Sequence, residues 1–190
     1  MRKRLGKIFF KKDAIAVSKN ILGKFLVHQL SSGKRLEGKI VEVEAYVGPE
    51  DLASHAKNNK KTERNRAEFL EGGHIYIYLV YGMYWQFNIS TGPARHPQCF
   101  LIRAINPIPH DKYKSANGPG KLCKYFKLDK SFYGEDITTS KRIWIEDRGE
   151  TVSPKNIIAA PRIGIDYAGP YWSRRKLRFY IKNNPAVSKK

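Results

Sequence analysis

Residues 40–46 read Ile40-Val41-Glu42-Val43-Glu44-Ala45-Tyr46 and alternate in polarity with a period of two. Successive side chains of a β-strand point to opposite faces, so the pattern predicts a strand with two unlike faces. The apolar residues share one face, and Glu42, Glu44 and Tyr46 share the other. Such a polar face is typical of a solvated strand, but it would also suit a catalytic carboxylate beside a ring that stacks on a base. The spacing does not favour either glutamate as the catalytic one.

The flanking sequence extends this strand into a sheet. Short apolar runs separated by turns predict strands over 24–30, 35–46, 74–80, 83–90, 99–105, 141–146, 157–165 and 177–181. Asn106-Pro107 should end the fifth of them. We expect helices over 14–22, capped by Asp13, over 62–71 and over 121–127. The fold class is therefore α+β: one domain, residues 1–190, with a curved antiparallel sheet or partly closed barrel and short flanking helices.

Charge is the strongest global signal. The chain has 36 Lys and Arg residues against 17 Asp and Glu residues, a formal charge of +19. Such an excess favours a polyanionic partner that binds through its phosphates, although a general lysine bias of the source proteome would produce it too. The basic residues are spread along the whole chain, which indicates a folded basic surface and not a basic tail.

Other classes of protein lack support in the sequence. Only two cysteines are present, Cys99 and Cys123, and no Cys or His spacing suits zinc, so we expect no disulfide, metal or other cofactor. No apolar run is long enough for a membrane span, and no signal core follows the basic residues 1–4. We expect a cytoplasmic protein that does not contact a membrane and, if bacterial, works at the nucleoid.

Aromatic residues crowd the two strands predicted over 74–90. They include Tyr76, Tyr78, Tyr81 and Tyr84. Strand aromatics usually pack in a core, but tyrosines interleaved with many cations also suit base stacking and wedging of a duplex. Arg64 lies upstream and could bind phosphate, and the exposed amides of 118–121 at a helix start could do the same.

Together these stretches resemble the alkyladenine (3-methyladenine) DNA glycosylase family, of the compact type without a helix-hairpin-helix. The likeness runs in consistent order along nearly the whole chain. It rests on residues 42–51, His55, 62–69, 76–84, 88–90, 101–104, 117–119, 121–123 and 177–180. The combination of Glu-x-Glu-Ala-Tyr with Tyr-Gly-Met-Tyr is specific. Departures occur at Trp85, Gln86 and Gly120, and they leave the range of lesions open.

The resemblance implies a role for each matching residue. Glu44 would activate the attacking water, and Arg103 would position that water and the carboxylate. Tyr46 and His55 would stack on one face of a flipped base and Tyr78 on the other. Asn88 would exclude the 2-amino group of guanine, and Tyr81 would fill the gap in the duplex. Weaker contacts to the DNA backbone would come from Thr62, Arg64, Met83 and Lys121.

The implied activity is base-excision repair by a monofunctional N-glycosylase. Its substrates would be alkylated or deaminated purines in double-stranded DNA, of the class of 3-methyladenine, 7-methylguanine, hypoxanthine and ethenoadenine, and it would act as a monomer without a cofactor. A base must leave the stack before it can be cut, and a damaged base leaves more easily. Two alternatives stay open: a non-catalytic DNA- or RNA-binding protein, and a lyase that uses a lysine as its nucleophile.

Overall fold

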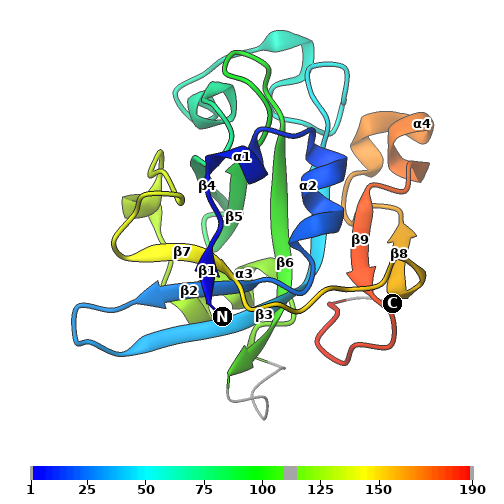
Figure 1. Cartoon of the computed structure of the whole chain (residues 1–190). Coiled ribbons are helices and arrows are strands. Elements are labelled where there is room, and N and C mark those ends of the chain that lie inside the picture. Colours follow the sequence, from blue (N-terminus) through cyan, green and yellow to red (C-terminus); the bar gives the residue numbers. More distant parts are fainter. Residues whose placement is uncertain (1, 109–114, 189–190) are drawn as a thin grey trace.

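The computed structural model describes residues 2–108 and 115–188, and it places them in a curved sheet with short helices around it (Figure 1). The strands are β1 (Lys3–Arg4), β2 (Phe25–Gln29), β3 (Arg35–Tyr46), β4 (Ile75–Val80), β5 (Tyr84–Ser90), β6 (Cys99–Ile108), β7 (Ile143–Asp147), β8 (Ile157–Ala160) and β9 (Arg178–Ile181). The α-helices are α1 (Lys7–Phe10), α2 (Ala14–Ile21), α3 (Pro119–Phe126) and α4 (Gly169–Arg174). The predicted α+β class is confirmed.

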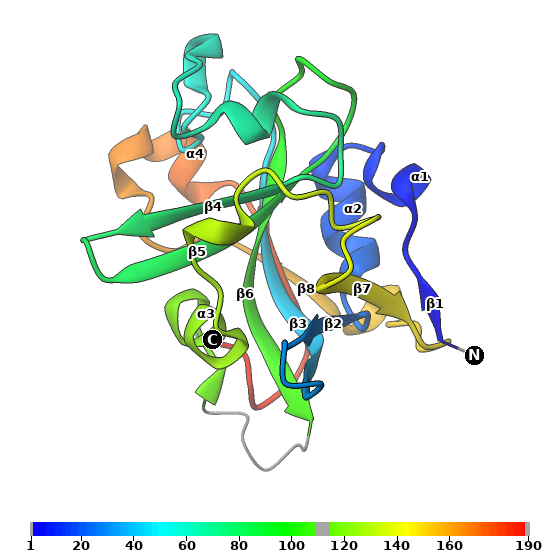
Figure 2. The ribbon, with the colours of Figure 1, turned by 90° about the vertical axis from the view of Figure 1, so that its left-hand side faces the viewer.

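All strand pairs of the described residues are antiparallel. The main path of the sheet runs β1-β7-β2-β3-β6-β5-β4, and β9 joins β3 on a branch that also carries β8. No ladder in the described part of the chain joins β1 to β4, so the sheet is not closed into a barrel. Figure 2 shows β3 and β6 running side by side through the middle of the molecule.

Strand β3 occupies the centre of this arrangement. Beyond its pairing with β2 it contacts β6 on one edge, and Glu42 to Glu44 pair with β9 on the other. Glu42 and Glu44 are both fully buried, so the interpretation of a solvated strand is wrong. The ladder between β3 and β6 shifts register twice, and these shifts leave Val41 and Arg103 without a direct partner across it. A β-bulge of this kind changes the direction of a side chain, and here it affects Arg103.

Strands β4 and β5, which were predicted as two strands over 74–80 and 83–90, form a hairpin. Tyr81 and Gly82 at its tip have positive φ angles of 52° and 69°, and the N–H of Met83 donates to the carbonyl of Val80 at 3.1 Å. Positive φ is unfavourable for a tyrosine and is found mostly where the surrounding structure or a function requires it. The strained residue is therefore a tyrosine at the tip of the hairpin that is 86 % exposed.

The helices cover the sheet and enclose the apolar core. Helix α2 begins at the predicted cap, where the Asp13 carboxylate accepts a hydrogen bond from the N–H of Ala16 at 2.9 Å. It packs on β3 and β6, and α3 packs on β5 and β6. The largest fully buried side chains of the core include Phe10, Phe87, Phe100 and Phe126.

Three of the predicted elements differ from the observed ones by more than two residues at a boundary. The helix expected over 62–71 is only a 3₁₀ turn, η2 (Arg66–Phe69), because the Asn65 side chain accepts hydrogen bonds from Thr62 and fixes a turn there. Strand β6 continues through Pro107. Because β5 pairs with β6 only over 99–101, the proline has β3 as its one strand neighbour among the described residues, and an edge position of this kind tolerates a proline. The strand expected over 157–165 ends at Ala160, where Pro161 begins a loop. The sequence did not indicate β1, α1 or α4.

None of the helices in the described segments is long and apolar enough to cross a lipid bilayer.

Candidate active site

A cleft of about 690 Å³ opens beside the β4–β5 hairpin. Strands β3, β4, β5 and β6 and the loop after β8 all contribute to its walls. A smaller recess of about 30 Å³ adjoins it, and the two share Tyr46, His55, Tyr78 and Tyr167 as lining residues. The recess is closed by Ala53, Glu68, Tyr76, Asn88 and Cys99. The site is thus an open cleft with a narrow aromatic extension into the protein.

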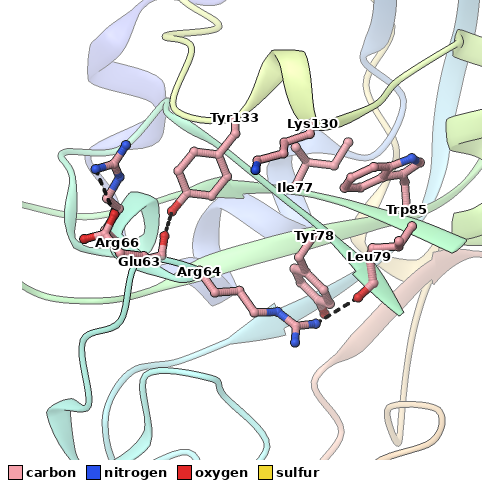
Figure 3. A pocket seen from close by; sticks show the side chains of 9 residues that line it. All are labelled: Glu63, Arg64, Arg66, Ile77, Tyr78, Leu79, Trp85, Lys130 and Tyr133. Atoms are coloured by element: carbon pink, nitrogen blue, oxygen red, sulfur yellow. Dashed lines mark hydrogen bonds and ion pairs between the residues drawn. The ribbon is translucent and has the colours of Figure 1, made fainter. Parts of the chain in front are cut away.

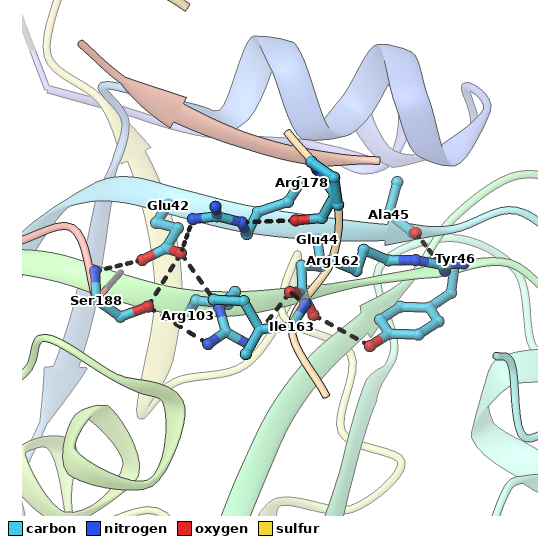
Figure 4. Close-up of polar contacts among 10 residues, drawn as sticks. Glu42, Glu44, Ala45, Tyr46, Arg103, Arg162, Ile163, Arg178 and Ser188 are labelled. Atoms are coloured by element: carbon cyan, nitrogen blue, oxygen red, sulfur yellow. Dashed lines mark hydrogen bonds and ion pairs between the residues drawn. The ribbon is translucent and has the colours of Figure 1, made fainter. Parts of the chain in front are cut away.

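Glu44 lies in the wall of the cleft and is held by three donors (Figure 4). Its Oε1 accepts a hydrogen bond from the N–H of Ile163 at 2.8 Å and lies 3.2 Å from a guanidinium nitrogen of Arg103. Among the described residues its Oε2 accepts one hydrogen bond, from the hydroxyl of Tyr46 at 3.1 Å. A carboxylate oxygen can accept two, so Oε2 keeps capacity for a water molecule in the cleft.

Glu42 shares the strand face of Glu44 but has a different environment. Its Oε1 accepts hydrogen bonds from Arg178 at 2.9 Å, Ser188 Oγ at 3.0 Å and Arg103 at 3.2 Å, and its Oε2 accepts one from the N–H of Ser188 at 2.7 Å. Among the described residues, Glu44 lines the cleft and Glu42 does not. The geometry therefore separates the two glutamates that the sequence pattern could not.

Arg103 connects the two carboxylates. Its Nε donates to Glu42, and Nη1 faces Glu44 at the same distance of 3.2 Å. Burial alone would lower the pKa of Arg103, but the carboxylates of Glu44 and Glu42 raise it above its usual value. The guanidinium is therefore a fixed positive charge beside Glu44, where it orients the carboxylate.

A buried ion pair between Asp51 and Arg162 packs against the ring of Tyr46. Arg162 donates two hydrogen bonds to Asp51, at 2.6 and 2.8 Å, and a third to the carbonyl of Ala45 at 3.0 Å. Its guanidinium lies over the Tyr46 ring, 4.7 Å from the centroid. Burial and the charge of Glu44 raise the pKa of the Tyr46 hydroxyl well above its usual value. Tyr46 is therefore a neutral, firmly placed hydrogen-bond donor to Glu44.

Three further rings form the aromatic extension. Nδ1 of His55 and the hydroxyl of Tyr76 share a hydrogen bond of 2.5 Å. The rings of His55 and Tyr78 are in edge-on contact, with their centroids 4.6 Å apart. Burial, followed by the charges of Arg64 and Lys57, lowers the pKa of His55 to about 4. At neutral pH the ring is uncharged, so the walls of the extension offer flat, neutral faces.

Asn88 is placed at the recess by β5. Its Nδ2 donates to the carbonyls of Tyr76 at 3.1 Å and Gln86 at 3.2 Å, and only 1 % of the residue is exposed. Both hydrogen bonds involve the amide nitrogen, so the side chain is anchored and its amide oxygen stays available to the recess. The sequence-predicted residues Glu44, Arg103, Tyr46, His55, Tyr78 and Asn88 thus come together at one site.

Comparison with known proteins identifies the family of the chain. Residues 8–185 match the family model described as methylpurine-DNA glycosylase (MPG). The chain belongs to this family. The resemblance stated from the sequence motifs is thereby confirmed, as is the enzyme class, a DNA glycosylase that hydrolyses N-glycosyl bonds.

Relatives of this glycosylase occur in mammals and bacteria. The chain is 39 % identical over 206 residues to the DNA-3-methyladenine glycosylase of Mus musculus, an alignment covering 97 % of the chain and 61 % of the mouse protein. It is 36 % identical to the protein of the same name from Homo sapiens, with 97 % and 68 % covered. A putative 3-methyladenine DNA glycosylase of Natranaerobius thermophilus is 39 % identical, with 95 % and 96 % covered.

The hairpin tip of the glycosylase projects beside the cleft. Tyr81 is 86 % exposed and Met83 66 % exposed, although both are large and apolar. A groove of about 350 Å³ separates the tip from the start of α3, where Lys121 lies. A Cβ atom at Gly120 would come within 2.9 Å of the Tyr84 ring, so close packing accounts for the glycine that departs from the family pattern.

Among the predicted backbone contacts, Arg64 lines the cleft and Lys121 lines the groove beside the hairpin tip. Arg64 also has a second role. Its guanidinium donates to the carbonyl of Leu79 at 2.9 Å and lies 5.2 Å from the centroid of the Tyr78 ring. Figure 3 shows Arg64 and Tyr78 at the edge of a second hollow of about 500 Å³, which Trp85 also lines. Thr62 is exposed and donates to Asn65. Among the departures from the family pattern, Gln86 lines the cleft and Trp85 lines the second hollow.

Sequence reasoning missed four contributors to the glycosylase site. They are the N–H of Ile163, the Asp51–Arg162 pair, Tyr167 and Glu68. Pro161 and Gly164, which has a φ of 74°, could have indicated a loop over 161–164 in place of a strand. Within the described residues, no three His, Cys, Asp or Glu side chains come together as a metal site would require.

Proposed function

We propose that this chain is a monofunctional glycosylase that excises alkylated and deaminated purines from double-stranded DNA. The substrates would be 3-methyladenine, 7-methylguanine, hypoxanthine and ethenoadenine, and the protein would act as a monomer. The observation that carries the proposal is Glu44. Its carboxylate is buried, is oriented by Arg103 and Ile163, and still has a free acceptor site facing a cleft wide enough for a nucleotide.

The chemistry follows from the position of this carboxylate. A water bound to Oε2 of Glu44 would attack C1′ of the flipped nucleotide, and Glu44 would take its proton as general base. The negative charge would also stabilise the cationic sugar that develops as the bond to the base breaks. The bond from C1′ to the base nitrogen breaks with its electrons on the base, so the products are a free purine and an abasic site.

Recognition would depend on the aromatic extension. A flipped purine would lie between Tyr46 and His55 on one face and Tyr78 on the other. The rings of His55 and Tyr78, whose centroids are 4.6 Å apart, would move apart to admit it. Alkylation at N3 or N7 makes a purine cationic, which strengthens its attraction to aromatic faces. Asn88 would exclude the 2-amino group of an undamaged guanine, and Tyr81 would fill the gap left in the duplex. Thr62, Arg64, Met83 and Lys121 would contact the DNA backbone.

One assay separates this proposal from its alternatives. The protein is incubated in excess with duplexes that each carry one lesion, and free base is measured by chromatography. We expect release of free purine, and no covalent adduct when borohydride is added. Binding to lesion DNA without base release would identify a non-catalytic binding protein. A borohydride-trapped protein–DNA adduct would identify a lyase with an amine nucleophile.

A further inference from the structure

Glu68 is a buried carboxyl group at the recess whose position the mechanism above does not explain. It lies on η2, only 1 % of the residue is exposed, and it lines the recess together with Asn88 and Tyr76. Its Oε1 accepts a hydrogen bond from the thiol of Cys99 at 3.3 Å. Its Oε2 is buried and has no hydrogen-bond partner among the described residues. A buried carboxyl oxygen without a partner is unfavourable, so this atom needs a donor or a cation from outside the chain.

The groups around Glu68 do not neutralise it. Asp51, which also carries a negative charge, is paired with Arg162, and His55 is uncharged at neutral pH. Burial raises the pKa of Glu68 to about 7. The hydrogen bond from Cys99 opposes this rise, and the negative charge of Asp51 adds to it. The other titratable groups that line the recess or act on Glu68 are tyrosine hydroxyls, and burial raises the pKa of each. They come from β3, β4, the turn after η4 (Lys130–Phe132) and η6 (Asp166–Ala168), and they are Tyr46, Tyr76, Tyr78, Tyr133 and Tyr167.

The position of the recess indicates what could supply the missing partner. Tyr46, His55 and Tyr78 line both the recess and the cleft, whereas Asn88 and Glu68 line the recess and not the cleft. The recess volume of about 30 Å³ is enough for one water but not for a base. A purine that stacks between Tyr46 and Tyr78 would therefore present one edge to the recess and leave the rest of its ring in the cleft.

We propose that Glu68 is a specificity-determining residue, whose carboxyl group meets the edge of the flipped purine and favours positively charged alkylated purines over neutral ones. The inference rests on the proposed excision of damaged purines. A carboxylate that faces a cation in a site shielded from water attracts it far more strongly than it would at the surface. A neutral purine gains no such charge interaction, and it leaves the carboxyl group protonated.

The test compares two lesions in the wild type and in Glu68→Gln. Single-turnover release of 3-methyladenine, a cation, is measured from methylated DNA with spontaneous loss subtracted, and release of hypoxanthine, which is neutral, from an oligonucleotide duplex. Removing the charge should lower the ratio of the two rates at least about tenfold, chiefly through 3-methyladenine. Glu63→Gln is the matched control: it removes a carboxylate that is 90 % exposed from the same segment and should leave the ratio unchanged.

A pH profile supplies a second, independent measurement. As pH rises through about 7, Glu68 ionises, so the preference of the wild type for 3-methyladenine should increase over this range. It should stay flat in Glu68→Gln. Cys99→Ala removes the thiol donor that favours the ionised form, so the increase should move to higher pH.

The outcomes are distinguishable. An unchanged ratio in a folded Glu68→Gln that still excises both lesions would overturn the role of Glu68 alone. If Glu68→Gln does not fold, an unmoved pH profile in Cys99→Ala would overturn it instead. A wild type that releases neither base would overturn the proposed function and this inference with it.

Discussion

Glu42 and Glu44 lie two residues apart on β3 and are both fully buried, but only Glu44 faces the cleft. The difference comes from their partners. Ser188, near the C-terminal end of the described chain, donates two hydrogen bonds to Glu42. Glu44 instead accepts a hydrogen bond from the backbone N–H of Ile163, in the loop after β8. Two carboxylates with the same strand parity thus have separate tasks, one structural and one at the site of the proposed reaction.

The first prediction follows from this pair. Glu44→Gln keeps the size of the side chain but removes its charge and basicity, so excision should fall at least about a hundredfold while lesion binding persists. Glu42→Gln should retain the chemistry but lose about 3–5 kcal/mol of stability, because it removes the buried carboxylate that Arg178 contacts and one of the two that Arg103 contacts. Single-turnover excision, lesion-DNA affinity and urea unfolding measure the three effects. An inactive Glu42→Gln beside an active Glu44→Gln would show that the wrong carboxylate was chosen.

The second prediction concerns the exposed hairpin tip. Tyr81→Ala should reduce excision from a duplex more than from a single strand, because only a duplex contains a gap to fill. Tyr171→Ala, which removes a tyrosine that is 66 % exposed on α4, serves as the control and should affect neither substrate. Rates are compared for one lesion in both strand contexts. Equal losses for Tyr81→Ala would indicate a packing role.

Asn88 provides the third prediction. A serine is too short to make both hydrogen bonds to the carbonyls of Tyr76 and Gln86, so Asn88→Ser should enlarge the recess and admit undamaged guanine. Release of normal guanine should rise at least about tenfold, since removing a clash relaxes discrimination. Ser90→Ala, two residues along β5, is the control and should not release guanine. A variant that removes hypoxanthine but still spares guanine would assign the exclusion to another residue.

The buried Asp51–Arg162 pair leads to a fourth prediction, about stability. Asp51→Asn leaves the Arg162 charge buried without its counter-ion, and the free energy of unfolding should fall by about 3–5 kcal/mol. The exposed pair of Glu63 and Arg66, 3.0 Å apart, is the comparison, and Glu63→Gln should change stability by less than about 1 kcal/mol. Urea unfolding monitored by circular dichroism measures both. Similar small losses would mean that Arg162 finds another partner.

The fifth prediction uses the net charge of +19. If the basic surface binds DNA phosphates, affinity for duplex DNA should fall at least about tenfold between roughly 50 and 200 mM salt, because bound counterions are released on association. Fluorescence anisotropy with a labelled duplex measures the slope. A flat response would argue against a surface that follows the phosphate backbone.

The sequence alone was sufficient wherever the signal was local. Strand β3 has the bounds predicted for it, Asp13 caps α2, and the strands predicted over 74–80 and 83–90 meet at a turn of Tyr81 and Gly82. Each of these depends on residues close together in the chain, so periodicity and turn chemistry are enough. The family motifs added which residues gather at the site, and the structure brings the six base-binding and catalytic candidates together.

Only the tertiary structure decided what each of those residues faces. A period of two gives Glu42 and Glu44 the same side of β3, but Ser188, 146 positions beyond Glu42, covers that residue and leaves Glu44 at the cleft. The packing of Arg162 on Tyr46 depends on contacts between distant segments. So does the position of the Glu68 oxygen that has no partner in the described part of the chain. Local patterns carry no information on such contacts, because which segments pack together is set by burial and hydrogen bonding across the whole sheet.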